Sequence, residues 1–125
     1  MLRKITKTVT CNASGVASVT IGTNIRGLLH ALYYRPTTMD TGADLTVTVT
    51  GTGAPILTKI NLGTGNSWLY PRAKPSIAND ATGGLNSTPS ALIPIVDDTV
   101  TFAVVQGGNG GIANVDLIWD DGRIS

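Results

Sequence analysis

The chain has 125 residues, a length that suits one domain. Only 14% of the residues are charged and the net charge is +1, so no strong field marks a nucleic-acid or acidic partner. No run approaches the ~18 apolar residues of a membrane helix, and the basic start MLRKITKTVTC lacks the apolar core of a secretory signal. We expect a protein that is made and assembled in a cytoplasm, with no nucleic-acid and no membrane partner.

The composition favours strands over helices. All eight acidic residues are aspartates, threonine repeatedly alternates with Val, Leu or Ile, and there are 15 glycines. Thr and Val suit a pleated surface and Asp and Gly suit turns, whereas helices use Glu and Lys on their surfaces. Cys11 is the only cysteine, so the chain has no intrachain disulfide and no cysteine cluster for a metal. We expect an all-β protein without a metal or another cofactor.

Strand-like segments follow one another along the chain, with Gly, Asn, Asp or Pro between most of them. In chain order they are residues 4–10, 15–22, 27–36, 43–51, 55–62, 66–72, 97–106 and 113–121. The clearest alternation has Leu45, Val47 and Val49 on one face and threonines on the other. The third segment, GLLHALYYRP, is apolar on both faces, which predicts a strand that is covered on both sides.

Turn signals separate these segments. The sequence NASG, residues 12–15, predicts a hairpin between the first two strands, and GGNGG, residues 107–111, predicts a hairpin tip before the last strand. Residues 72–90 are rich in Pro, Asn, Gly, Ser and Ala without periodicity, which predicts a long surface loop. Residues 1–7 are either an arm laid on a neighbouring subunit or a frayed or edge first strand.

About eight short strands, with no segment of 3.6-residue period, predict a single β domain over residues 1–125. The economical architecture is two antiparallel sheets packed face to face, as in a sandwich or a jelly-roll-like fold. A two-sheet domain of this size has a thin core and many edges, so we expect oligomerisation. The sequence does not determine the strand order.

The stretch DTGAD, residues 40–44, matches the catalytic loop of retroviral-type aspartic proteases, in which a dimer brings together two carboxylates that share a proton. Its context departs from that family's pattern. Pro36 and two threonines precede the motif, no helix follows, and the nearest glycine-rich candidate for a flap lies too close. Asp40 and Gly42 between two strands are typical of a turn, in which Gly allows positive φ. We therefore interpret Asp40 as a turn residue and expect no enzyme activity.

Other candidates for chemistry have simpler structural interpretations. His30, the only histidine, lies among apolar residues and has no nucleophile motif as a partner. The pairs Asp97/Asp98 and Asp120/Asp121 flank strands and lack the ligand spacing of a calcium loop. No G-K-[ST] follows GGNGG, so that cluster is not a phosphate loop. We expect no catalytic residue and no cofactor or metal site.

The segment SWLYPR is the best candidate for a binding surface. Trp68, Tyr70 and Arg72 alternate, so they share one face of a strand, and these residue types are the most enriched at protein–protein hot spots. The alternative is that Trp68 and Tyr70 belong to the core. A carbohydrate site would also use such aromatic residues, but two of them with few acidic partners make a weak one.

Four stretches carry a resemblance to a known group of proteins: LLHALYYRP, DTGADLTVT, ILTKINLGTGNSWLYPR and IPIVDDTVTFAVVQGGNGG. Their order and spacing, between Arg26 and Trp119, resemble small proteins of tailed bacteriophages and prophages. The resemblance implies a structural protein of the virion, and first of all a minor head protein that decorates or cements the capsid. It is more specific about the virion than about the position in the virion.

From the resemblance we expect a virion protein that binds the major capsid protein of an assembled head, with a tail or head–tail junction component as the alternative. Analogy with decoration proteins at threefold positions suggests a homotrimer. Trp68, Tyr70 and Arg72, together with the basic Arg3 and Lys4, are the candidate contacts with these partners. A glycan-binding module that uses the two aromatic residues is a rival from a different class.

Overall fold

The structure is a computed structural model that describes residues 1–74, 81–85 and 87–123. These residues form nine strands and no helix. The strands are β1 (Leu2–Thr10), β2 (Ala17–Thr20), β3 (Ile25–Pro36), β4 (Asp44–Val49), β5 (Pro55–Lys59), β6 (Ser67–Leu69), β7 (Ile93–Asp98), β8 (Val100–Val105) and β9 (Ile112–Asp120). The predicted all-β fold is confirmed.

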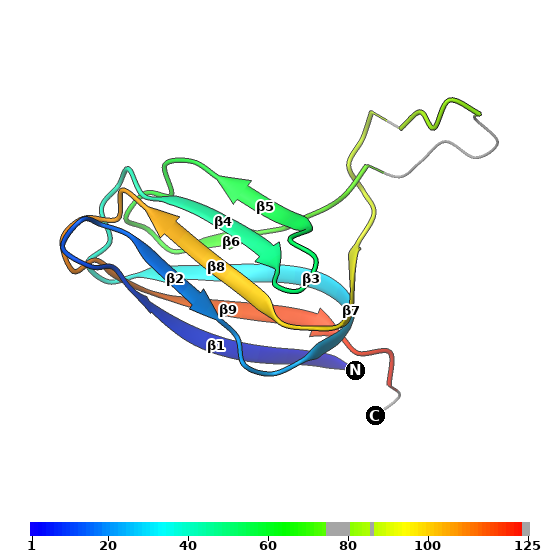
Figure 1. Ribbon diagram of the computed structural model, residues 1–125, viewed down its shortest axis with the longest axis horizontal. Helices are drawn as coiled ribbons and strands as arrows, with labels where there is room; N and C mark the ends of the chain where they lie inside the picture. Colours follow the sequence, from blue (N-terminus) through cyan, green and yellow to red (C-terminus); the bar gives the residue numbers. More distant parts are fainter. Residues whose placement is uncertain (75–80, 86, 124–125) are drawn as a thin grey trace.

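The strands build two antiparallel sheets that face each other (Figure 1). The five-stranded sheet has the order β1-β9-β3-β6, and β7 also pairs with β3. β6 and β7 share one edge of the long strand β3, with β6 beside its C-terminal half and β7 beside its N-terminal half. The four-stranded sheet has the order β2-β8-β4-β5. This arrangement confirms the predicted two-sheet sandwich.

The core lies between the sheets and follows the predicted alternation. Leu45 and Val47 of β4 and Phe102 of β8 are fully buried, while the threonines between them turn outward. Burying one such apolar side chain stabilises the fold by about 1.5–3 kcal/mol. A single cluster of buried side chains, which runs from Val9 to Trp119, joins the two sheets.

The two predicted hairpins are wrong, because each turn carries the chain from one sheet to the other. β1 and β9 belong to the five-stranded sheet, whereas β2 and β8 belong to the four-stranded sheet. The first turn itself forms, with the Asn12 N–H donating to the Val16 carbonyl at 2.9 Å. The two turns also bond to each other, since the Gly107 N–H donates to the Gly15 carbonyl at 2.9 Å. Turn residues specify a reversal of the chain but not the sheet in which the next strand pairs.

Only one face of β3 packs against the other sheet, which corrects the expectation of a strand covered on both sides. A β-bulge at His30 shifts the register with β9 between Leu29 and Ala31. An extra residue in one strand breaks the two-residue alternation. An unbroken alternation drawn through the sequence of β3 therefore assigns its apolar residues to both faces of the strand. Leu29 and Tyr34 are buried in the core, while Tyr33 lies half-buried on the outer face.

β7 is a strand that the sequence does not predict, since Pro94 interrupts the pattern IPIV. Proline donates no ladder hydrogen bond and is therefore confined to edge strands. Pro94 fits because β7 lies at the edge of the five-stranded sheet, where it pairs with β3. The described residues thus hold nine strands instead of about eight.

Residues 2–10 form the paired strand β1 instead of a free arm. β1 is antiparallel to β9 over its whole length, from the pair Leu2 and Asp120 to the pair Thr10 and Ile112. Its inward residues meet the core side of β9, and its outward Thr6 and Thr8 meet Asp116 and Asn114 of β9. The basic residues near the N-terminus therefore have fixed positions on the sandwich.

The two ends of the segment between β6 and β7 are joined by an antiparallel bridge where the segment leaves the sandwich. Ala73 and Ala91 exchange two backbone hydrogen bonds, at 2.8 and 3.0 Å. Beyond this bridge, the described residues of the predicted loop 72–90 are mostly exposed and extend away from the two sheets (Figure 1). Residues 75–80 and 86 of that prediction lie outside the described residues.

Candidate docking face

The aromatic residues of SWLYPR lie on the outer face of the five-stranded sheet. Leu69 of β6 points into the core and is 8% exposed, whereas Trp68 and Tyr70 are 50% and 61% exposed. Alternation along the strand therefore turns the two aromatic rings toward solvent. The alternative that Trp68 and Tyr70 belong to the core is wrong.

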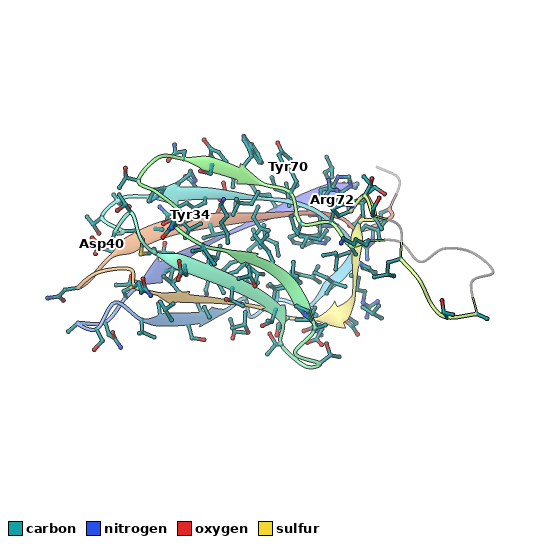
Figure 2. The ribbon with its side chains drawn as sticks, turned by 90° about the horizontal axis from the view of Figure 1, so that it is seen from above. Tyr34, Asp40, Tyr70 and Arg72 are labelled. Carbon is teal, nitrogen blue, oxygen red and sulfur yellow. The ribbon has the colours of Figure 1, made fainter. Side chains whose placement is uncertain are left out.

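Trp68 packs against two tyrosine rings. Tyr33 of β3 is its cross-strand neighbour, with ring centroids 4.4 Å apart and planes tilted by 34°. The Tyr70 ring is nearly parallel to Trp68, at 14°, with centroids 6.3 Å apart. The guanidinium carbon of Arg72 lies over the Tyr70 ring, 6.0 Å from its centroid. We call Tyr33, Trp68, Tyr70 and Arg72 the aromatic row. In Figure 2, Tyr70 of this row lies at the outer surface, whereas Tyr34 lies between the sheets.

The bulge of β3 holds Arg72 in place. Nη1 of Arg72 donates to the carbonyl oxygen of His30 and to that of Pro71, both at 2.8 Å. His30 is the residue at which the β3–β9 register shifts, so its carbonyl gains a partner outside the regular ladder. Hydrogen bonds from a charged donor are stronger than neutral ones, and they fix the guanidinium beside Tyr70. Arg72 is thus anchored to β3, and its guanidinium is held beside the Tyr70 ring.

An ion pair with a buried carboxylate lies beside the aromatic row. Asp116 of β9 is 7% exposed and stands opposite Tyr33 in the β3–β9 ladder. Its Oδ1 accepts hydrogen bonds from Nη2 of Arg35, at 2.8 Å, and from the hydroxyl of Thr6, at 2.5 Å. A buried carboxylate is expected to be paired in this way. The pairing neutralises the acid that lies near the centre of the face.

Lys4 and Arg3 point to opposite sides of β1. Lys4 is exposed on the same outer face as the aromatic row, and its register partner on β9 is Ile118. Arg3 faces the other side and forms an ion pair with Asp121 through its Nε. This pairing holds the pKa of the Asp121 carboxyl well below its ordinary value. The structure therefore places Lys4 on the same outer face as the aromatic row and pairs Arg3 with Asp121.

The outer face of the four-stranded sheet has a different chemistry. Asp44, Ala103 and Val105 lie on it, but most of it is a group of threonines that we call the threonine face: Thr20, Thr46, Thr48, Thr50, Thr58 and Thr101. The hydroxyl of Thr101 bonds with those of Thr20, at 3.0 Å, and Thr50, at 2.8 Å. These side chains carry no ring and no charge and satisfy part of one another's hydrogen bonding. The threonine face is thus a poor source of hot-spot contacts.

Asp40 lies in an exposed turn at the end of the sandwich away from the termini (Figures 1 and 2). Its carbonyl accepts from the Ala43 N–H at 3.2 Å, and its own N–H donates to the Gly107 carbonyl at 3.0 Å. These backbone bonds confirm the interpretation of Asp40 as a turn residue. Gly42 does not adopt positive φ, so the conformational role expected for that glycine is wrong.

The remaining acids near strand ends serve local contacts. Asp97 pairs with Nε of Arg26 at 3.1 Å, which lowers the pKa of its carboxyl. Asp98 accepts from the backbone N–H of Gly51 at 3.2 Å and of Thr99 at 2.8 Å. Within residues 1–74, 81–85 and 87–123, no group of three or more His, Cys, Asp or Glu side chains is placed to hold a metal ion.

Tyr33, Arg35 and Asp116 are residues of this face that sequence reasoning does not find. Their association with Trp68 depends on the register of β9, β3 and β6, and strand order cannot be derived from alternation alone. The sequence YYR offers a weak signal. One of two adjacent aromatic residues in a strand with one buried face must point outward.

Two comparisons with known proteins found no match. A scan against models of protein families matched none of them, and a search of curated protein sequences returned no match. None of the described residues forms a helix that is long and apolar enough to cross a membrane. The function must therefore be argued from the surface that the structure presents.

Proposed function

We propose that this chain is a structural protein of a tailed-bacteriophage virion that decorates or cements the assembled head. The sequence resemblance supports the virion class. The observation that carries the docking role is the aromatic row, which is exposed and already ordered on one sheet face. Tyr, Trp and Arg at such positions are typical of protein–protein hot spots.

Docking by this face would proceed by surface complementarity. The rings of the row support one another, so few side-chain rotamers are lost when a partner covers them. Trp68 is the central member because it contacts both tyrosines, and truncating one such residue typically costs at least 2 kcal/mol of binding energy. The threonine face would remain toward solvent or make water-mediated contacts.

The partner in this proposal is the major capsid protein, and the protein itself acts as a homotrimer. Each sheet has edge strands, among them β1 and β5, which can take part in contacts between subunits. A tail or head–tail junction component would use the same aromatic row to bind a different neighbour. The experiment below separates these two positions on the virion.

A glycan-binding module has less support from the geometry. Sugar rings stack on free aromatic faces, whereas the faces of Trp68 and Tyr70 pack within the row. The protease alternative requires two Asp40 carboxylates that share a proton. Asp40 sits instead in an exposed turn, and no donor among the described residues contacts its carboxylate. Neither rival is favoured by a specific observation.

Cosedimentation of the purified protein with phage heads that lack it, and separately with isolated tails, tests the proposal. We expect saturable binding to heads and none to tails, and mass spectrometry should detect the chain in purified particles. Saturable binding to tails alone would replace the decoration role by a tail role. Binding to neither, with no signal in purified particles, would reject the virion assignment.

A further inference from the structure

We propose that the face from Lys4 on β1 to the aromatic row at β6 fits a partner protein surface that combines carboxylates with apolar side chains. We call this surface the docking face; it consists of Lys4, Ile118, the ion pair of Arg35 with Asp116, and the aromatic row. The inference rests on the proposed function and names the chemistry of the shell surface that the protein would cover.

The net charge of +1 conceals an uneven local distribution. The docking face carries three basic side chains, Lys4, Arg35 and Arg72, and one acid, Asp116. Arg35 already neutralises that acid at 2.8 Å. Lys4 and Arg72 have no carboxylate partner among the residues that the structure describes. Two positive charges therefore remain for a partner, despite the nearly neutral chain.

The two unpaired cations lie at opposite margins of the face. Lys4 is on the edge strand β1, and its row continues through Ile118 of β9 to Ala31 of β3. Arg72 lies beyond β6 at the other margin, beside Tyr70. Four strands at about 4.8 Å spacing make the face roughly 14 Å wide. A segment of a partner laid across it would meet an apolar and aromatic centre between two positive charges.

The orientation of the rings favours the same partner. An aromatic ring has a negative face and a positive edge. In the row, the face of Trp68 packs against Tyr33 and Tyr70, and Arg72 lies over Tyr70. Any ring edge that a partner contacts attracts carboxylates, as the two cations do. Single-stranded nucleic acid would need free ring faces on which its bases stack, so it fits this face less well.

Matched charge reversals test the inference on the intact protein. Lys4→Glu and Lys59→Glu change the net charge equally, but Lys59 is exposed at the end of β5, on the edge of the other sheet. We expect Lys4→Glu to weaken binding to heads roughly tenfold and Lys59→Glu to change it less than about twofold. Added salt should reduce the difference between the two variants. Equal affinities of both variants and the unmodified protein would overturn the inference and leave the proposed function intact.

A probe without any phage component tests the face independently. Trp68 is exposed and Trp119 is buried, so fluorescence that responds to bound peptide reports mainly on the docking face. We expect a short peptide of alternating glutamate and leucine to change this fluorescence saturably, and Lys4→Glu to abolish the change. A peptide of alternating lysine and leucine should have no effect. No response to the acidic peptide, or a response only to single-stranded oligothymidylate, would reject the inference. If the protein binds the acidic peptide but does not bind heads, the proposed function is rejected instead.

Discussion

Tyr34 brings a polar atom into the core that no described residue satisfies. Its hydroxyl is buried without a hydrogen-bond partner, and the side chain lies between the two sheets (Figure 2). Burial raises the pKa of Tyr34 to about 12, with a smaller contribution from the nearby Cys11 thiol. An unsatisfied buried hydroxyl costs about 1–3 kcal/mol of stability. The protein is therefore expected to be less stable with tyrosine than with phenylalanine at position 34.

Tyr34→Phe should raise the free energy of unfolding by about 1 kcal/mol near neutral pH, because it removes the unsatisfied hydroxyl. The folded-state pKa lies above the ordinary value of 10.0, so the tyrosine stays neutral in the folded chain while it ionises in the unfolded one. The free energy of unfolding is therefore unaffected by this ionisation below pH 10, and it falls as the pH rises from 10 toward 12.

Urea unfolding at about pH 8 and about pH 11 measures this effect. The advantage of Tyr34→Phe over the unmodified protein should grow at the higher pH. Tyr70→Phe is the matched control, because Tyr70 is 61% exposed, and it should leave the loss at high pH unchanged. An identical alkaline loss in Tyr34→Phe and the unmodified protein would contradict this account of the buried hydroxyl.

At the scale of single elements, β3 is the strand on which the docking face depends. It pairs with β9 on one edge and with β6 and β7 on the other, and its bulge supplies the carbonyl that holds Arg72. Gly27 permits the close approach of β3 to the end of β9. A Cβ at this position would lie 1.9 Å from the carbonyl oxygen of Asp120, and the backbone has φ of +128°.

Gly27→Ala should destabilise the protein by more than about 2 kcal/mol, because both the clash and the backbone strain must be relieved by separating β3 from β9. Gly65→Ala is the matched control, since Gly65 has no atom within 4 Å of an added Cβ and its φ is not positive. That control should change stability by less than about 1 kcal/mol. Thermal unfolding of both variants measures the difference. Equal melting temperatures would show that β3 and β9 can separate without cost.

The strands whose inward residues can be assigned from the sequence are those with an uninterrupted two-residue alternation. β4 and β8 alternate without interruption, so their inward residues could be assigned from the sequence. β7 could not, since the proline signal that breaks central strands is tolerated at a sheet edge. The sheets of β1 and β2 could not either, because a turn sequence encodes local dihedral angles and not the long-range partner.

The docking face shows the same division between local and long-range information. Alternation places Trp68 and Tyr70 on one face of a short strand, and that local relation is correct. Whether this face is core or surface depends on the opposite sheet. The neighbours Tyr33 and Asp116 depend on register across three strands. The sequence therefore indicates the anchors of the site but not the ion pair beside them.

At the scale of the whole molecule, the sandwich has two outer faces of unequal chemistry. The five-stranded sheet presents stacked rings and unpaired cations, while the threonine face presents small uncharged side chains. A protein that coats an assembled shell needs one adhesive face and one face that does not recruit further layers. Under the proposed function, this asymmetry predicts that the shell covers the aromatic row and leaves the threonine face exposed.

Equilibrium binding of Trp68→Ala and Thr46→Ala to purified heads tests this central claim most directly. Both side chains are exposed, so neither change should alter the free energy of unfolding by more than about 1 kcal/mol. We predict that Trp68→Ala weakens binding about thirtyfold or more, which corresponds to the loss of about 2 kcal/mol at a hot spot. Thr46→Ala, on the threonine face, should bind as the unmodified protein does. Unchanged affinity in Trp68→Ala, or an equal loss in Thr46→Ala, would contradict the assignment of the docking face.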